Sequence, residues 1–269
     1  MRCFTATDGV QLHYTDWGQG RPVVLLHGWP LSLTSWDYHA IRLVEHGYRV
    51  IRYDRRGFGR SEQPWDGYDY DTLAADLGAL LRHLALDDAV LVGFSMAAGE
   101  AVRYLARYGN ATVSAAVLIA GVTPMLAQSP ANPQGIPAAD FAGFEQALSD
   151  SPGPTLSAYA HSQFSDPSWR EDYLAMARQA SARAIAATAR AWYTTDFHAD
   201  LATIGVPILI LHGGADQSAP PALTGRKAHA LIPASRYVEY PAIGHYLPLE
   251  AKERLTDDLL VFLEATSRR

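Results

Sequence analysis

A serine flanked by small residues lies between an expected strand and an expected helix. The segment Gly93-Phe94-Ser95-Met96-Ala97 follows the apolar run at 89–92 and opens a helical pattern that continues to Tyr108. It is close to the G-x-S-x-G pattern, in which a sharp turn presents a serine hydroxyl above a sheet. Gly93 supplies one small residue, and Ala97 replaces the final glycine at the cost of one methyl group. Taken alone, the segment also fits an ordinary serine at a helix start.

A serine nucleophile needs a general base, and in this strand-turn-helix setting the chain order is serine, acid, histidine. Asp216 follows the apolar run at 208–211 and a pair of glycines, and His245 follows the strand-like run at 236–240. Asp216 would orient the imidazole, and His245 would take the serine proton and return it to a leaving group. The competing residues precede a strand, lie inside one, fall in a helix or belong to an insertion: Asp196, Asp200, His161, His198, His212 and His229.

Acyl transfer through a serine also requires two N–H donors for the oxygen of the tetrahedral intermediate. Met96, the residue after the serine, is one expected donor. The other is expected in the loop after an early buried strand, at His27-Gly28-Trp29-Pro30. Because proline has no N–H, Trp29 is the second expected donor, and His27 is expected to be structural.

Apolar runs alternate with helical patterns on both sides of a helix-rich insertion. This succession predicts a doubly wound, mostly parallel α/β sheet with helices on both faces and an antiparallel hairpin at one edge. We assign 1–121 and 202–269 to the core and 122–201 to a helical cap insertion. Strands are expected at 4–6, 10–14, 22–27, 48–53, 89–92, 113–120, 206–212 and 236–240. Helices are expected at 35–46, 71–84 (capped by Asp71), 95–108, 140–148, 168–193, 221–231 and 252–265.

Composition narrows the range of partners. The 269 residues carry a formal net charge of -6 and no Lys/Arg run, which argues against nucleic acid or an anionic membrane as a partner. The single cysteine, Cys3, cannot form an internal disulfide. The first residues hold no apolar core of a signal peptide, and no apolar stretch is long enough to span a membrane, so a cytoplasmic location is expected.

Metal and nucleotide motifs are missing from the sequence. There is no H-E-x-x-H and no G-x-G-x-x-G after a strand, so we expect neither a metal nor a bound cofactor. Arg55 and Arg56, in the loop after the run at 48–53, are expected to form structural ion pairs.

The combined motifs resemble one branch of a known superfamily. The matching segments are His27–Pro30, Tyr53–Ser61, Gly93–Met96, Glu100, Arg103-Tyr104, Thr195–Phe197, Asp216 and His245. They are similar to the cofactor-free haloperoxidases, also described as perhydrolases and aryl esterases of the α/β-hydrolase superfamily. The resemblance spans nearly the whole chain and is weakest across 126–191.

The resemblance implies an ester that acylates the serine, after which water releases an acid or hydrogen peroxide releases a peracid. The peracid can oxidise halide without metal or haem. It also implies homo-oligomers, including trimers, and associates Pro30 with perhydrolysis. The departure is Ala97-Ala98 in place of the usual Gly-Gly, which puts rate and substrate preference in question.

The sequence therefore predicts a serine hydrolase of small carboxylic esters with perhydrolase activity. A lactonase, an amidase or a carbon–carbon-bond hydrolase with the same triad remains open, as does a small-molecule receptor that retains the triad. Dehalogenases and epoxide hydrolases are disfavoured, because they use an aspartate where Ser95 stands. The expected pocket residues are Trp29, Pro30, Phe94, Tyr159, Phe164 and Trp192. For Tyr159, Phe164 and Trp192, packing between cap and core is the alternative.

Overall fold

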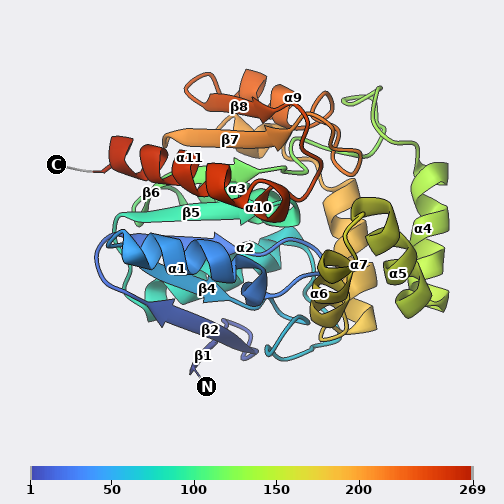
Figure 1. The fold of residues 1–269 in the computed structure, drawn as a ribbon, viewed down its shortest axis with the longest axis horizontal. Helices are drawn as coiled ribbons and strands as arrows, with labels where there is room; N and C mark the ends of the chain where they lie inside the picture. The colour runs from blue at the N-terminus through green and yellow to red at the C-terminus, as the bar shows by residue number, and fades with distance from the viewer. Residues whose placement is uncertain (1, 268–269) are drawn as a thin grey trace.

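A single eight-stranded sheet organises the molecule (Figure 1). The computed structural model describes residues 2–267. Along the sheet the strands follow the order β1-β2-β4-β3-β5-β6-β7-β8, and only the pairs β1·β2 and β2·β4 are antiparallel. The strands are β1 (Arg2–Thr5), β2 (Gln11–Trp17), β3 (Pro22–Leu26), β4 (Arg49–Tyr53), β5 (Ala89–Phe94), β6 (Val113–Ile119), β7 (Ile208–Gly213) and β8 (Arg236–Tyr240). The α/β-hydrolase architecture expected from the sequence is thus confirmed.

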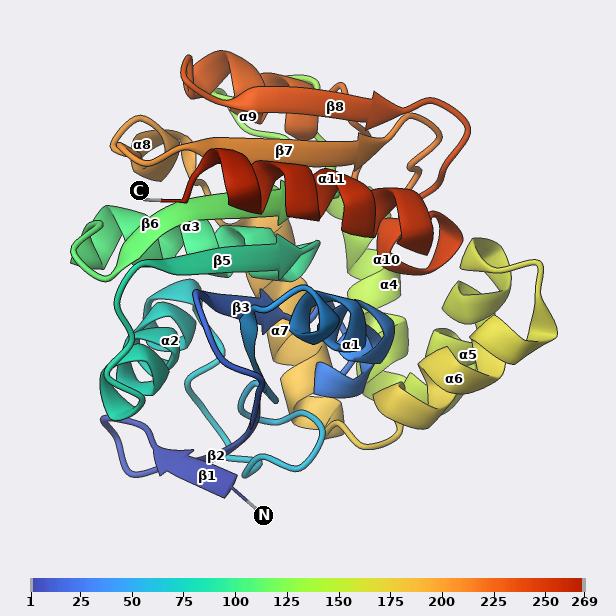
Figure 2. The same cartoon turned by 60° about the vertical axis from the view of Figure 1, so that its left-hand side comes forward.

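The central strands are buried on both faces, which explains their continuous apolar runs. Every residue of β5 is buried, as are the last four of β3. The hairpin β1–β2 occupies one edge of the sheet and β8 the other (Figure 2). Gly9 has a φ of 93° in the hairpin turn, a conformation that favours glycine.

Some helices cover the two faces of the sheet, and others form a separate group beside it. Helix α1 packs against α11, and α2 packs against α3. Helices α4 to α7 lie together on the right in Figure 1, with the sheet on their left. The helices are α1 (Asp37–Glu45), α2 (Tyr70–His83), α3 (Met96–Tyr108), α4 (Ala138–Asp150), α5 (Pro152–Gln163), α6 (Pro167–Ala177), α7 (Ala182–Thr194), α8 (His198–Leu201), α9 (Gly225–Leu231), α10 (Leu247–Glu250) and α11 (Lys252–Ala265).

Several expected helix boundaries were wrong. Asp69, not Asp71, caps α2, because its side chain accepts the N–H of Thr72. Asp71 instead pairs with Arg103 and Arg107. Helix α1 begins only at Asp37, after a short 3-10 turn, and α9 begins at Gly225 rather than at 221.

The segment at 120–207, all of which the structure describes, holds helices and no strand of the sheet. The single helix expected at 168–193 is two helices, α6 and α7. Ser181 starts the second helix by accepting the N–H of Ala184, while its own N–H donates to Gly57 O at 2.8 Å. Helix α5 was not expected. None of the helices in residues 2–267 has the length and apolarity needed to span a membrane.

Candidate active site

The turn between β5 and α3 holds Ser95 in an unusual backbone conformation. Its φ is 56° and its ψ is -117°, a region that non-glycine residues adopt only when the surrounding structure enforces it. The N–H of Ser95 donates to Ile119 O on the neighbouring strand at 2.8 Å. A Cβ placed on Gly93 would lie 2.5 Å from Ala97 O, so the turn needs glycine there. This is the strained elbow expected from the sequence.

Ser95, His245 and Asp216 come together although they lie far apart in the chain. The Ser95 hydroxyl donates to His245 Nε2 at 2.9 Å, and His245 Nδ1–H donates to Asp216 Oδ2 at 2.7 Å. All three residues are buried, with exposed fractions of 7 %, 6 % and 2 % respectively. This chain of hydrogen bonds can move a proton from the hydroxyl to the imidazole.

The carboxylate of Asp216 is held by further donors. Its Oδ1 accepts the backbone N–H groups of Ser218 and Ala219, each at 2.8 Å. Burial alone would raise the pKa of Asp216, but the imidazoles of His245 and His212 hold that pKa well below its usual range. The residue therefore carries a negative charge that faces His245 in one fixed direction.

His212 contributes to this arrangement, although its position inside an expected strand predicts no part for it beside the triad. It is fully buried, and its Nε2–H donates to Ala219 O at 2.8 Å. The same nitrogen lies 3.2 Å from Asp216 Oδ2. The one signal in the sequence is its position at the end of a strand, four residues before the acid. Of the other competitors, Asp200 pairs with Arg103, and Asp196 pairs with His198.

Two backbone donors lie at the ends of neighbouring strands. Met96 opens α3 directly after the serine, and Tyr70 OH donates to its carbonyl at 3.0 Å. Trp29 lies in a tight turn closed by the bond from Leu31 N–H to Gly28 O at 3.0 Å. Within residues 2–267, neither Trp29 N–H nor Met96 N–H donates to a protein acceptor. Both N–H groups are therefore left without an acceptor among the described residues.

A hollow of about 20 Å³ lies beside the serine and the imidazole. It has room for about one water molecule. Its lining residues are Trp29, Ser95, Val122, Leu126, Tyr159, Trp192, Ser218, Ala219 and His245. Three of the expected pocket residues, Trp29, Tyr159 and Trp192, are therefore in this wall.

The other expected pocket residues lie elsewhere around the triad. Phe94 and Phe164 line a separate hollow of about 460 Å³. The Phe94 ring also contacts His245 in a tilted arrangement, with ring centroids 5.3 Å apart. Pro30 is buried in the turn after Trp29 and lines neither hollow.

Trp29 joins the turn after β3 to the helical segment at 122–201. Its indole N–H donates to Ile185 O on α7 at 3.0 Å. Its ring contacts Phe144, Tyr159 and Trp192 edge-on, with centroids 5.8 to 5.9 Å apart. The wall of the hollow beside Ser95 therefore includes aromatic side chains from both the turn after β3 and the helical segment.

Comparison with known proteins agrees with this geometry. The α/β hydrolase fold family matches residues 21–252. A non-haem haloperoxidase of Rhodococcus erythropolis is 39 % identical over 98 % of this chain and 100 % of its own length. A bifunctional esterase/perhydrolase of Acinetobacter calcoaceticus is 36 % identical, with the same coverage. The crystal structure of a bromoperoxidase from Bacillus anthracis superposes with a TM-score of 0.93 at 36 % identity, covering 98 % of this chain and 100 % of that one.

The chain belongs to the non-haem haloperoxidase family of α/β hydrolases. Against the family pattern, Ala97 and Ala98 replace the usual pair of glycines. A Cβ on Gly121 would lie 2.7 Å from Ala98 Cβ, so a glycine at 121 leaves room for that methyl group. The elbow therefore accommodates the alanines without displacing Ser95 from His245.

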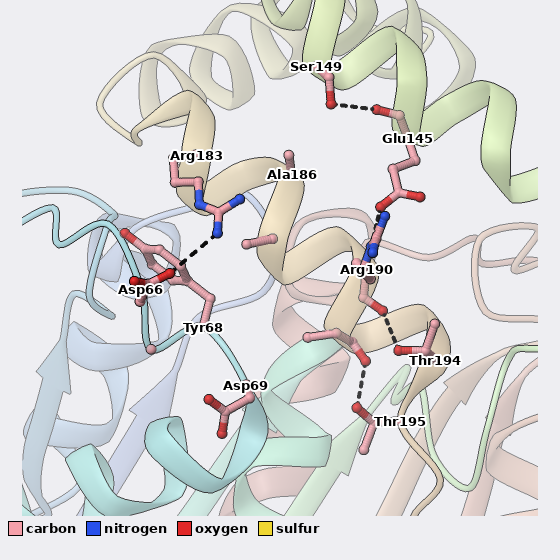
Figure 3. Close-up of a pocket in the computed structure, with 13 residues that line it drawn as sticks. Asp66, Tyr68, Asp69, Glu145, Ser149, Arg183, Ala186, Arg190, Thr194 and Thr195 are labelled. Atoms are coloured by element: carbon pink, nitrogen blue, oxygen red, sulfur yellow. Dashed lines mark hydrogen bonds and ion pairs between the residues drawn. The ribbon is translucent and has the colours of Figure 1, made fainter.

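A third hollow of this protein, about 520 Å³ in volume, lies away from the triad (Figure 3). It lies between the loop at 66–69 and helices α4 and α7, and none of the triad residues lines it. Arg183 pairs there with Asp66, and Arg190 with Glu145. Among residues 2–267, no group of three or more His, Cys, Asp or Glu side chains is arranged to hold a metal ion.

Proposed function

We propose that this protein hydrolyses small carboxylic esters through an acyl-enzyme on Ser95. The observation that carries the proposal is the pair of hydrogen bonds from Ser95 to His245 and from His245 to Asp216, at 2.9 and 2.7 Å. Two further features support it: the strained turn at the serine and the unoccupied N–H groups of Trp29 and Met96.

In the proposed mechanism, Ser95 Oγ attacks the ester carbonyl while His245 Nε2 takes the hydroxyl proton. The carbonyl oxygen becomes an oxyanion that accepts hydrogen bonds from the N–H groups of Trp29 and Met96. Asp216 stabilises the resulting imidazolium, which then donates its proton to the departing alcohol. Water repeats the sequence on the acyl-enzyme and releases the carboxylic acid.

Perhydrolysis is the same reaction with hydrogen peroxide in place of water. The peroxide attacks the acyl-enzyme, His245 takes its proton, and a peracid leaves as Ser95 is regenerated. The peracid can then oxidise bromide to hypobromite in solution. The bifunctional esterase/perhydrolase among the relatives supports this second outcome.

We further propose that the segment 122–201 acts as a cap and that short acyl groups are preferred. The hollow beside Ser95 measures about 20 Å³, and Leu126, Tyr159 and Trp192 of this segment supply part of its wall. An acetyl group is larger than a water molecule, so it already requires a small displacement of these side chains. A longer acyl chain requires a larger displacement.

The test is hydrolysis of p-nitrophenyl acetate and butyrate by wild type and Ser95→Ala, each with EDTA. Turnover that disappears in the variant and is unaffected by EDTA supports a metal-independent serine esterase. Acetate, hydrogen peroxide and bromide are then supplied together, and bromination of monochlorodimedone reports perhydrolysis. A folded wild type that turns over neither ester contradicts the proposal.

The resemblance also supports a homo-oligomer. We expect a mass larger than one chain in light scattering at micromolar concentration. A monomer at all concentrations would contradict this part of the proposal without touching the chemistry.

A further inference from the structure

The two donors of the proposed oxyanion hole belong to different segments. Trp29 follows β3, and Met96 begins α3, and the two segments are not continuous in the chain. An oxyanion is stabilised well only when both donors lie about 2.7–3.1 Å from the same point. Something must therefore fix the distance between the turn after β3 and the start of α3.

A buried ion pair lies between these two segments. Glu100 is on α3, one turn after Met96, and is 0 % exposed, and Arg55 is 1 % exposed. Arg55 Nε and Nη2 approach Glu100 Oε2 at 2.8 and 2.7 Å. The same guanidinium donates through Nη2 to His27 O, in the turn after β3, at 2.9 Å. The Arg55 side chain thus bonds both α3 and the turn after β3.

The imidazole of His27 completes the connection to the turn. The N–H of Arg55 donates to His27 Nε2 at 3.0 Å, and His27 Nδ1 bonds Gly28 O at 2.9 Å. Burial, with the neighbouring Arg55 charge, holds the pKa of His27 well below its usual value, so the ring stays neutral. Gly28 is the residue directly before Trp29, so its carbonyl belongs to the peptide group that carries the Trp29 N–H.

On the side of the helix, Tyr53 at the end of β4 donates through its hydroxyl to the other oxygen of Glu100. Both carboxylate oxygens therefore have partners, one at the end of β4 and one in the loop that follows it. Stability alone is a weak reason for such a pair, because apolar residues of the same volume often stabilise a core as well.

We infer that the Arg55–Glu100 pair positions the N–H groups of Trp29 and Met96 for the transition state, a role that rests on the function proposed above. Neither side chain touches the substrate. Their effect is on the distance between the two donors, so it should appear in turnover more than in ground-state binding.

The molecule offers a matched control in the next residue along the chain. Arg56 is also 1 % exposed and pairs with Asp76, which is 0 % exposed, through Nε and Nη2 at 2.6 and 2.7 Å. Asp76 lies on α2, and Arg56 also contacts Asp8 in the hairpin turn. This pair bonds neither the turn after β3 nor α3.

The experiment compares Glu100→Gln with Asp76→Asn in p-nitrophenyl acetate hydrolysis. Both variants break a buried ion pair, and both should lower the melting temperature. We expect kcat of Glu100→Gln to fall about 10- to 100-fold with KM changed less than about threefold. Asp76→Asn should keep kcat within about twofold of wild type. The inhibition constant of a trifluoromethyl ketone, which forms a tetrahedral oxyanion on serine, should rise in parallel with the loss of kcat.

The amount of folded site is measured by titration with a fluorophosphonate, so unfolding is not mistaken for slow turnover. If Glu100→Gln does not fold, Arg55→Met combined with Glu100→Leu removes both charges, and the same loss of kcat is expected. Wild-type kcat in the folded variant, or equal losses in Glu100→Gln and Asp76→Asn, would overturn the inference. An inactive wild type would overturn the proposed function as well.

Discussion

Buried ion pairs lie within the apolar core of the sheet-bearing part of the molecule, whereas the helical segment at 122–201 packs through aromatic and other neutral side chains. In the first part, Arg52, Arg55 and Arg56 are each 1 % exposed and each pairs with a carboxylate. In the described structure of 122–201, the buried polar side chains are neutral: Thr123, Asn132 and Thr188. This difference determines how well each part of the molecule tolerates substitutions. A buried charge left without its partner is costly, whereas an apolar contact can be repacked at modest cost.

This contrast predicts all-or-none effects on activity around the triad and graded effects in the helical segment at 122–201, which is proposed above to act as a cap. The largest is expected for Ser95→Ala, which removes the nucleophile and leaves only binding and the N–H donors. We expect kcat for p-nitrophenyl acetate to fall by at least about 10⁴-fold. Ser235→Ala is the control, because this buried serine lies directly before β8 and donates to Ile232 O. Loss of less than tenfold in folded Ser95→Ala would contradict the role of the serine.

Asp216→Asn should be nearly as damaging, although the change is a single atom. The amide has no charge to stabilise the imidazolium, and its NH₂ group can force His245 into the wrong tautomer. We expect a loss of about 10³- to 10⁴-fold in kcat. Asp200→Asn makes the same chemical change at a site paired with Arg103 and should retain activity within about twofold. Equal losses in both variants would show that the effect is on folding.

The sequence predicted the residues that follow strands but not the buried contacts between distant segments. Ser95, Asp216 and His245 each follow an apolar run, and parallel strands end at one edge of a sheet, so their meeting was predictable. The ion pair between Arg55 and Glu100 could not be predicted, because nothing in either segment shows which buried carboxylate an arginine faces. The break between α6 and α7 was missed for a similar reason: the N–H of Ser181 bonds Gly57, a contact that depends on the folded arrangement.

A further prediction about the sheet-bearing part concerns its stability at acid pH. Burial lowers the pKa of His39 to about 4, and the ring links α1 to Pro248 O and Thr256 Oγ1 at 2.9 Å each. In the unfolded chain this group binds a proton near pH 6.5, while the folded protein excludes it. Stability is therefore full above pH 6.5 and is lost as the pH falls toward 4, by about 3 kcal/mol.

Urea unfolding of wild type and His39→Gln between pH 7 and pH 4 measures this effect. The variant should show a shallower dependence on pH. His161→Gln, which changes an exposed histidine of the cap, should leave the slope unaltered. A wild-type slope shared by His39→Gln would assign the acid sensitivity to other groups.

Within the cap, Trp192→Ala should change selectivity and leave the chemistry intact. The ring lines the hollow at Ser95, and its indole N–H has no hydrogen-bond partner among residues 2–267, so no polar group is orphaned. We expect the ratio of kcat/KM for butyrate over acetate to rise about tenfold. Trp169→Ala, on the separate hollow near Phe164, is the control. An unchanged ratio in Trp192→Ala would mean that other side chains set the acyl length.

The smallest effect is expected for the cap's own ion pair. Arg190 on α7 pairs with Glu145 on α4 at the rim of the hollow in Figure 3, and the arginine side chain is 68 % exposed. Exposed pairs are screened by water and salt, so Arg190→Ala should reduce the free energy of unfolding by about 0.5 kcal/mol or less. Urea unfolding at low and high salt measures it, with Asp76→Asn as the buried counterpart. A loss of about 2 kcal/mol or more, above the range for exposed pairs, would mean that this pair contributes as a buried one does, because packing of neutral side chains predicts near-indifference to this substitution.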